Sequence, residues 1–163
     1  TSFIHHIMNL PSLPPITFEG TVKHYAEIIL GQSYGDGNEV GFWLAFAMVL
    51  IYVPVLGRQA AKHFFGKDGS LVGIGLVGLF SVALTFGAIC MADTSLSGFV
   101  PKAIQTLVIS LCTGTVVLLV TSATTQVLSM NFGPSLGLQL IFWNIIFLAQ
   151  LATKFLTDFW KHV

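Results

Sequence analysis

Charged side chains are scarce in this sequence. Of its 163 residues, 7 are Lys or Arg and 7 are Asp or Glu, so 9% are charged, whereas a soluble domain carries about 25%. Hydrophobic residues make up 54% of the chain. A soluble monomer of this length has to present a charged surface to water, and so few charges cannot form one. The composition therefore predicts an integral membrane protein.

An excess of positive charge is also lacking, because the formal net charge is zero. Nucleic-acid-binding domains and polybasic membrane anchors both depend on clustered Lys and Arg. We therefore expect lipid and other membrane proteins as partners, and no nucleic acid. The two cysteines, Cys90 and Cys112, lie in apolar stretches without a CxxC motif. This placement predicts two buried free thiols.

Ionisable residues are missing from the middle of every predicted membrane span. Such residues mark proton relays and ion paths in membrane proteins, and a buried His is the usual haem ligand. The sequence also contains no GxSxG, HExxH or Walker A motif. We therefore expect a chain that is not an enzyme on its own and not an ion-coupled transporter acting alone.

Long uncharged runs are what the sequence does contain. They cover residues 40–57, 69–92 and 103–153. A membrane span needs about 20 residues, so the third run holds two spans and a short turn. We expect that turn at 131–135, where Pro134 would stop a helix. The fold class predicted is an all-α integral membrane protein with four transmembrane helices, near 40–61, 70–92, 103–130 and 136–158, the last two forming a helical hairpin over 103–158.

The first 38 residues differ from the rest, so we divide the chain into a segment outside the membrane, 1–38, and a four-helix domain, 39–163. Pro11–Pro15 is proline-rich and predicts an extended stretch. A short helix is expected over 21–30, too short to span and therefore lying in the membrane interface. Because a segment rich in Pro and Gly is poorly ordered unless something holds it, we expect residues 1–38 to contact a neighbouring subunit.

Small residues form a regular pattern in the second predicted span. In lipid, helices associate through close packing of small side chains, and spacings of three and four residues place side chains on one helix face. The pattern predicts a helix-packing interface with other membrane subunits. Its members are Gly75, Gly78, Ser81, Thr85, Ala88 and Ala92.

Hydroxyl side chains form a similar line in the third predicted span. Thr106, Ser110, Thr113, Thr121 and Thr124 recur at helical spacing. Such hydroxyls bond back to their own helix or across to a neighbour, and packing is the interpretation we favour. The alternative is a small homo-oligomeric channel or transporter for a polar solute, with these hydroxyls and the amides of the fourth span along its path.

Four polar side chains are candidates for cofactor binding. His24 and His63 lie near membrane edges, where an imidazole could ligate haem iron or chlorophyll magnesium. Asn144 and Gln150 lie deeper, where an amide either bonds to another helix or binds the carbonyl of a quinone or pigment. A helix-bundle site for quinone, haem or pigment is therefore a further alternative, and bound lipid is another expectation. We predict no metal site and no catalytic residue.

The leading hypothesis is a structural or accessory subunit of a multi-subunit membrane complex. An energy-converting assembly, respiratory or photosynthetic, is the expected setting. Residue 1 is Thr rather than Met, which is compatible with removal of a presequence and favours the mitochondrial inner membrane or the thylakoid. Arg58, Lys62 and Lys67 make the 58–69 loop the most basic short loop, so we expect it on the cytoplasmic, matrix or stromal side.

Overall fold

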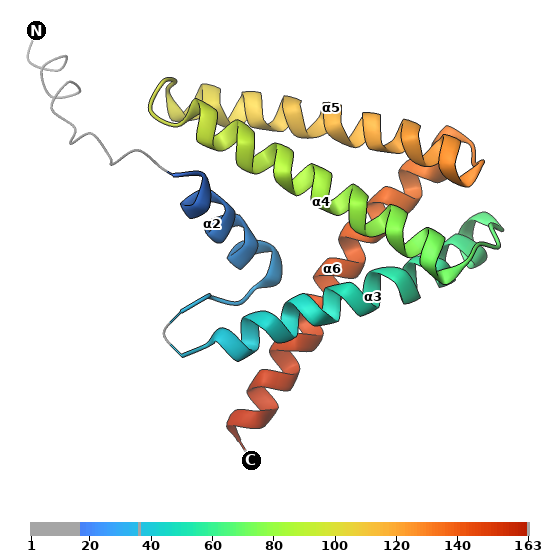
Figure 1. Ribbon diagram of the computed structural model, residues 1–163, viewed down its shortest axis with the longest axis horizontal. Helices are drawn as coiled ribbons and strands as arrows, with labels where there is room; N and C mark the ends of the chain where they lie inside the picture. Colours follow the sequence, from blue (N-terminus) through green and yellow to red (C-terminus); the bar gives the residue numbers. More distant parts are fainter. Residues whose placement is uncertain (1–16, 36, 163) are drawn as a thin grey trace, which may run out of the picture.

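The structure, a computed structural model, describes residues 17–35 and 37–162, and the regular elements among them are helices. The four long helices each have the length and apolar composition of a membrane span, which confirms the helical fold class and the number of candidate spans. The predicted stretch Pro11–Pro15 lies outside the described residues. The helices are α2 (Phe18–Leu30), α3 (Glu39–Phe65), α4 (Leu71–Leu96), α5 (Lys102–Leu128) and α6 (Phe132–Lys161) (Figure 1).

Two helix boundaries differ from the predictions. Helix α2 begins earlier than residue 21 because the Thr17 hydroxyl caps it, accepting a hydrogen bond from the Gly20 backbone N–H at 3.1 Å. The turn predicted at 131–135 is wrong, since α6 already begins at Phe132. Pro134 lies in the first turn of α6, where the backbone N–H has no helical acceptor in any case. Proline therefore starts this helix instead of stopping it.

The helices are arranged as two pairs that diverge. Helices α4 and α5 run antiparallel side by side, while α6 crosses α3 (Figure 1). The pairs approach each other near the 66–70 connection and separate toward the other end, where α2 lies in the opening and contacts α3, α4 and α6. The predicted hairpin over 103–158 is present as a short connection, but α5 packs along α4 and meets α6 near the turn.

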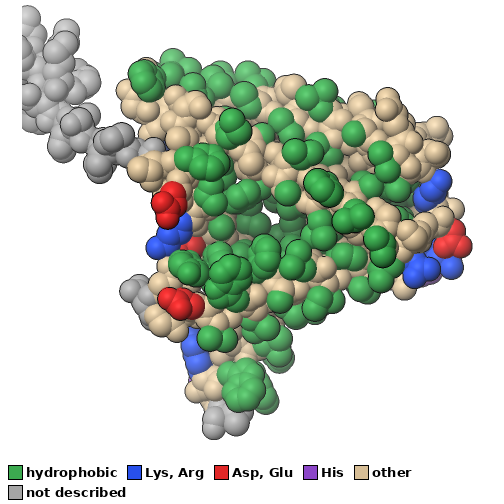
Figure 2. All heavy atoms as spheres, viewed as in Figure 1, with side chains coloured by type: hydrophobic (Ala, Val, Ile, Leu, Met, Phe, Trp, Pro, Cys, Tyr) green, Lys and Arg blue, Asp and Glu red, His purple; other side chains and the backbone are tan. Residues whose placement is uncertain are grey.

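Charged side chains lie toward the two ends of the helices, and hydrophobic side chains cover the face between them (Figure 2). This is the distribution that a protein needs when water contacts its ends and hydrocarbon contacts its sides. Exposed large apolar residues are accordingly frequent on all four long helices. The surface thus agrees with the apolar composition of the spans.

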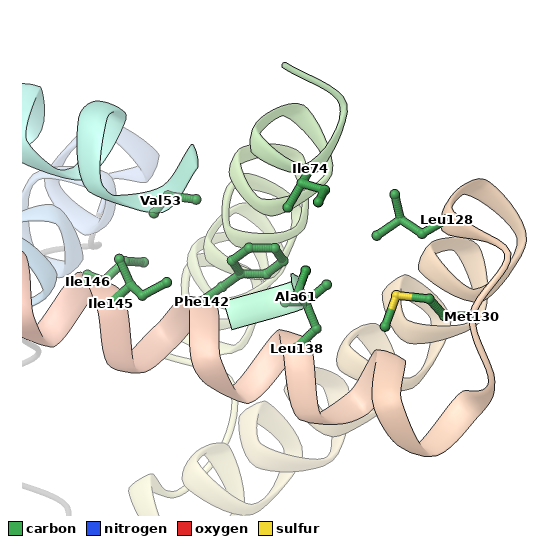
Figure 3. Packing of buried hydrophobic residues seen from close by; sticks show 9 residues of the cluster. All are labelled: Val53, Ala61, Ile74, Leu128, Met130, Leu138, Phe142, Ile145 and Ile146. Carbon is green, nitrogen blue, oxygen red and sulfur yellow. The ribbon is translucent and has the colours of Figure 1, made fainter. Parts of the chain in front are cut away.

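The core is centred on Phe142 of α6, whose side chain is fully buried (Figure 3). Its ring lies against a glycine on each of two neighbouring helices. A Cβ added to Gly57 of α3 or to Gly78 of α4 would lie 2.7 Å from Cε1 of Phe142 in both cases. Any side chain at these two positions would therefore overlap the ring. The buried residues packed in the same cluster are Val53, Ala61, Ile74, Leu128, Met130, Leu138, Ile145 and Ile146.

We predict that Gly78→Ala destabilises the bundle by about 1–3 kcal/mol, the usual cost of overpacking a core. Gly114→Ala on α5 is the matched control, because a Cβ there meets nothing within 4 Å. The control should be neutral or stabilising by up to about 1 kcal/mol, since Ala favours a helix over Gly. Thermal unfolding of both variants in detergent measures the difference. Equal stability of the two variants would contradict this packing.

Candidate functional site

The small-residue face of α4 packs against helices of the same chain. A Cβ added to Gly75 would lie 2.7 Å from Cβ of Pro54 in α3, and Gly78 contacts Phe142 of α6. Ser81 and Thr85 are buried, while Ala88 and Ala92 are half-buried. The first four positions are thus filled from within the chain, and a partner helix has no access to them in this arrangement.

A buried amide joins three helices at this level of the bundle. Gln139 of α6 is 3% exposed, and its Nε2 donates to the Ser81 hydroxyl of α4 at 3.1 Å and to the Thr124 hydroxyl of α5 at 2.8 Å. Both hydroxyls donate their own protons to backbone carbonyls one turn earlier, those of Val77 and Val120. Each hydroxyl oxygen is therefore free to accept from the amide, and this proton assignment orients the amide group.

The amide network has a structural consequence. A carboxamide moved into an apolar interior without partners costs several kcal/mol, so Gln139 stabilises the arrangement in which both hydroxyls reach it. From sequence Gln139 was expected only as one possible amide along a channel. A lone Gln in an apolar run does signal a buried partner, but the partners lie 58 and 15 residues away and no local pattern identifies them.

We predict a measurable coupling between Gln139 and Thr124. Gln139→Leu and Thr124→Val should each lower the stability of the bundle, and the double variant should lose less than the sum. The coupling expected for an interhelical hydrogen bond in a membrane is about 0.6–1.7 kcal/mol. The measurement is a double-mutant cycle, in which the native chain, both single variants and the double variant are unfolded in detergent by heat or denaturant. Strict additivity would show that the two side chains do not interact.

A second polar cluster fastens α2 to the end of α4. The Asp93 carboxylate of α4 accepts a hydrogen bond from the Gln105 amide of α5 and lies beside the Tyr25 hydroxyl of α2. Beside it, the Thr94 hydroxyl donates to the Thr21 hydroxyl of α2 at 3.0 Å. Burial, together with the neighbouring Asp93 carboxylate and its negative charge, raises the pKa of Tyr25 to about 12. One carboxylate thus connects three helices.

The Tyr25 contact makes the docking of α2 dependent on pH. A free tyrosine has a pKa near 10, whereas the pKa of the docked Tyr25 is about 12. The contribution of this contact to the free energy of unfolding is therefore complete below pH 10 and is lost as the pH rises toward 12. We predict that the stability advantage of the native protein over Tyr25→Phe narrows across this range. Unfolding measured at a series of pH values tests this, and an advantage that is independent of pH would refute it.

The structure does not bring the four cofactor candidates together. His24 and His63 are exposed, on α2 and at the far end of α3. Asn144 is exposed and donates to the Leu140 carbonyl of its own helix, whereas Gln150 donates to the Ile28 carbonyl of α2. Within the described residues, no group of three or more His, Cys, Asp or Glu side chains is placed to hold a metal ion.

The cysteine prediction is half wrong. Cys90 is buried as predicted, but Cys112 is exposed on α5. Position 112 lies on the outer side of α5, whose inner side faces α4, and a helix in lipid can expose a small apolar side chain at no cost. Apolar surroundings in the sequence therefore do not imply burial within this chain.

The hydroxyl line of α5 is divided between the interior and the outside. Thr121 and Thr124 are buried, whereas Thr106 and Ser110 are exposed and Thr113 is half-buried. All five donate to the carbonyl four residues earlier on their own helix. These hydroxyls thus have their protons engaged locally and do not share one path inside the chain.

A small apolar cavity of about 250 Å³ lies between α4 and α5. Leu76, Phe80, Leu84 and Val127 are among the residues that line it, and the Ser81 and Thr124 hydroxyls that it also contacts are engaged with Gln139. Pockets that enclose a small molecule usually measure about 300–1,000 Å³. The lining suits a hydrocarbon chain, because its other residues are apolar and its two hydroxyls are already hydrogen-bonded to Gln139.

No family model, curated protein or solved structure matches this chain. The arrangement of its own residues therefore provides the evidence for function. Its buried polar groups hold helices together, and one amide in the middle of a span points outward.

Proposed function

We propose that this chain is a structural transmembrane subunit of a larger multi-subunit membrane assembly. The observation that carries the proposal is Asn144. It lies in the middle of α6, inside a run of 51 residues without Asp, Glu, Lys or Arg, and yet it is exposed. An amide that faces hydrocarbon loses its hydrogen bonds to water, and the bond to the Leu140 carbonyl uses only one of its groups.

Among residues 17–35 and 37–162, no other helix supplies a hydrogen-bond partner to Asn144. Gln139, one turn away on α6, is satisfied by α4 and α5, but the Asn144 side is occupied by exposed apolar side chains such as Leu140, Phe147 and Leu148. In membranes, Asn and Gln side chains bond across helix interfaces. A helix from another subunit that supplies a donor or acceptor to Asn144 accounts for its position.

Helix α5 provides a second support, because little of it is covered by the chain. In the most apolar 18-residue stretch of each helix, the buried share is 6% in α5 and 39% in α6. Ser110 and Gly114 lie on the uncovered side, and a Cβ added to Gly114 meets nothing. Small residues on an open face allow another helix to approach closely. Partner contact through α5 and the Asn144 side of α6 thus replaces the expected contact through α4.

The setting that we propose is an energy-converting complex of the mitochondrial inner membrane or thylakoid, with the 58–69 loop on the matrix or stromal side. This setting rests on the sequence. Within the described residues, the polar contacts support a bracing role, because Gln139 joins α6 to α4 and α5, and Asp93 joins α4 to α5 beside Tyr25 of α2. The subunit would contribute shape and contacts to the assembly.

We predict that Asn144→Leu leaves the fold intact but weakens assembly. Leu removes an amide from the lipid-facing side, so the stability of the isolated chain should not fall, whereas the bond to the partner is lost. The measurement is native gel electrophoresis of gently solubilised source membranes, followed by mass spectrometry of the bands. The native chain should migrate with a large set of other proteins, and the variant should move at least partly to a small band.

Gln126→Leu is the matched control. Gln126 is also an exposed amide, but it lies in the last turn of α5, where water can solvate it. This variant should stay with the assembly. A small band that contains only the native chain would refute the subunit proposal, and an Asn144→Leu variant that stays fully assembled would remove its main support.

A further inference from the structure

A polar cavity lies where α2 ends beside the last turns of α6. Its volume is about 430 Å³, within the range of small-molecule sites. Its lining comes from the turn after α2 and from residues 150–161 of α6, so it lies where the uncharged run of α6 ends. The polar residues that line it are Gln32, Gln150, Lys154, Thr157, Asp158 and Lys161.

The wall of this cavity is built by a contact between two distant segments. Gln150 Nε2 of α6 donates to the Ile28 carbonyl in the last turn of α2 at 3.2 Å. The next residues turn away through Gly31, whose φ of 65° is left-handed and favours glycine. A Cβ at Gly31 would also overlap the Gln150 side chain. The sequence of both segments is therefore suited to keep α2 against α6 at this point.

The cavity lining carries more positive than negative charge. Lys154, Thr157 and Lys161 follow one another at spacings of three and four residues on one face of α6, and Asp158 adds one negative charge. The two ammonium groups are donors suited to phosphate oxygens, whereas the Thr157 hydroxyl donates its proton to the Lys154 carbonyl at 2.9 Å. Asp158 can accept a hydrogen bond from a hydroxyl or amine in the same ligand. The lining thus complements a group with one net negative charge.

The surface next to the cavity is apolar and continues into the membrane span. Leu151 lines the cavity and is 49% exposed, and Phe147 and Leu148 continue the exposed apolar face one turn further. Lys154 is the first charged residue after the 51 uncharged ones, so it lies at the boundary between hydrocarbon and water. A ligand that binds here therefore contacts both the charged side chain of Lys154 and the apolar surface at Leu151.

From this arrangement we infer a binding site for an anionic glycerophospholipid. Lys154 and Lys161 hold the phosphodiester, Asp158 accepts from a headgroup hydroxyl, and an acyl chain lies along Leu151 and Phe147. Charge-assisted hydrogen bonds from ammonium groups to phosphate oxygens are strong. A free phosphate shares the headgroup chemistry, but it makes no use of the apolar face. This site and the partner contact proposed above share the Phe147 side of α6, so the lipid site is tested on the isolated chain, in which no partner covers that side.

The test is native mass spectrometry of the purified full chain in a neutral detergent, titrated with phosphatidylglycerol and, separately, with phosphatidylcholine. The native chain should bind phosphatidylglycerol more tightly than phosphatidylcholine. A Lys154→Gln/Lys161→Gln double variant should bind it about tenfold more weakly. The matched control is Lys62→Gln/Lys67→Gln, which removes the same charge at the opposite end of the molecule and should bind as the native chain does.

Three results would overturn the inference. Unchanged affinity in the Lys154/Lys161 variant would show that the cavity does not bind the headgroup. An equal loss in both double variants would indicate attraction by total charge and no site. Displacement of the lipid by inorganic phosphate at a similar concentration would identify an anion site without a lipid preference. Retained helix content by circular dichroism confirms that each variant is folded.

Discussion

The packing of Phe142 between Gly57 and Gly78 is the constraint on which the bundle depends. A fully buried ring on α6 lies against Gly57 of α3 and Gly78 of α4, and an added Cβ at either glycine would overlap its Cε1 atom. In lipid no hydrophobic force brings helices together, so close contact of this kind is the main source of attraction. The ring therefore determines how near α3 and α4 come to α6, and Gln139 one turn earlier then reaches Ser81 and Thr124.

Polar groups in this chain fall into two kinds according to what satisfies them. Gln139 and Asp93 bind partners on other helices of the same chain, and they connect α2, α4, α5 and α6. Within the part of the chain that the structure describes, Asn144 bonds only to its own helix and is exposed. Two amide side chains in the same span can thus differ, one bracing the chain and the other offering a contact to another molecule. This difference supports the proposed role as a subunit.

Much of the fold follows from patterns along the chain. Uncharged runs of sufficient length predicted the four long helices, and they did so because hydrocarbon excludes charge over a fixed thickness. Helix ends were less predictable: Thr17 extends α2 through a capping bond, and Pro134 lies in the first turn of α6 although proline usually ends a helix. The small residues of α4 indicated a packing face, but spacing shows only that a face exists. Which helix covers it depends on contacts such as Gly75 with Pro54.

By itself the sequence determined that the surface of this protein is suited to lipid. It also determined the number of apolar helices and the lack of ionisable groups in their middle parts, because composition and run length are local properties. Only the tertiary structure decided which amides are buried, since Gln139 and Asn144 differ by five positions and thus by which side of α6 meets α4 and α5. It also brought Gly31 and Gln150 together to form a cavity beside Lys154. Contacts between residues more than a hundred positions apart arise from packing, and no local pattern encodes them.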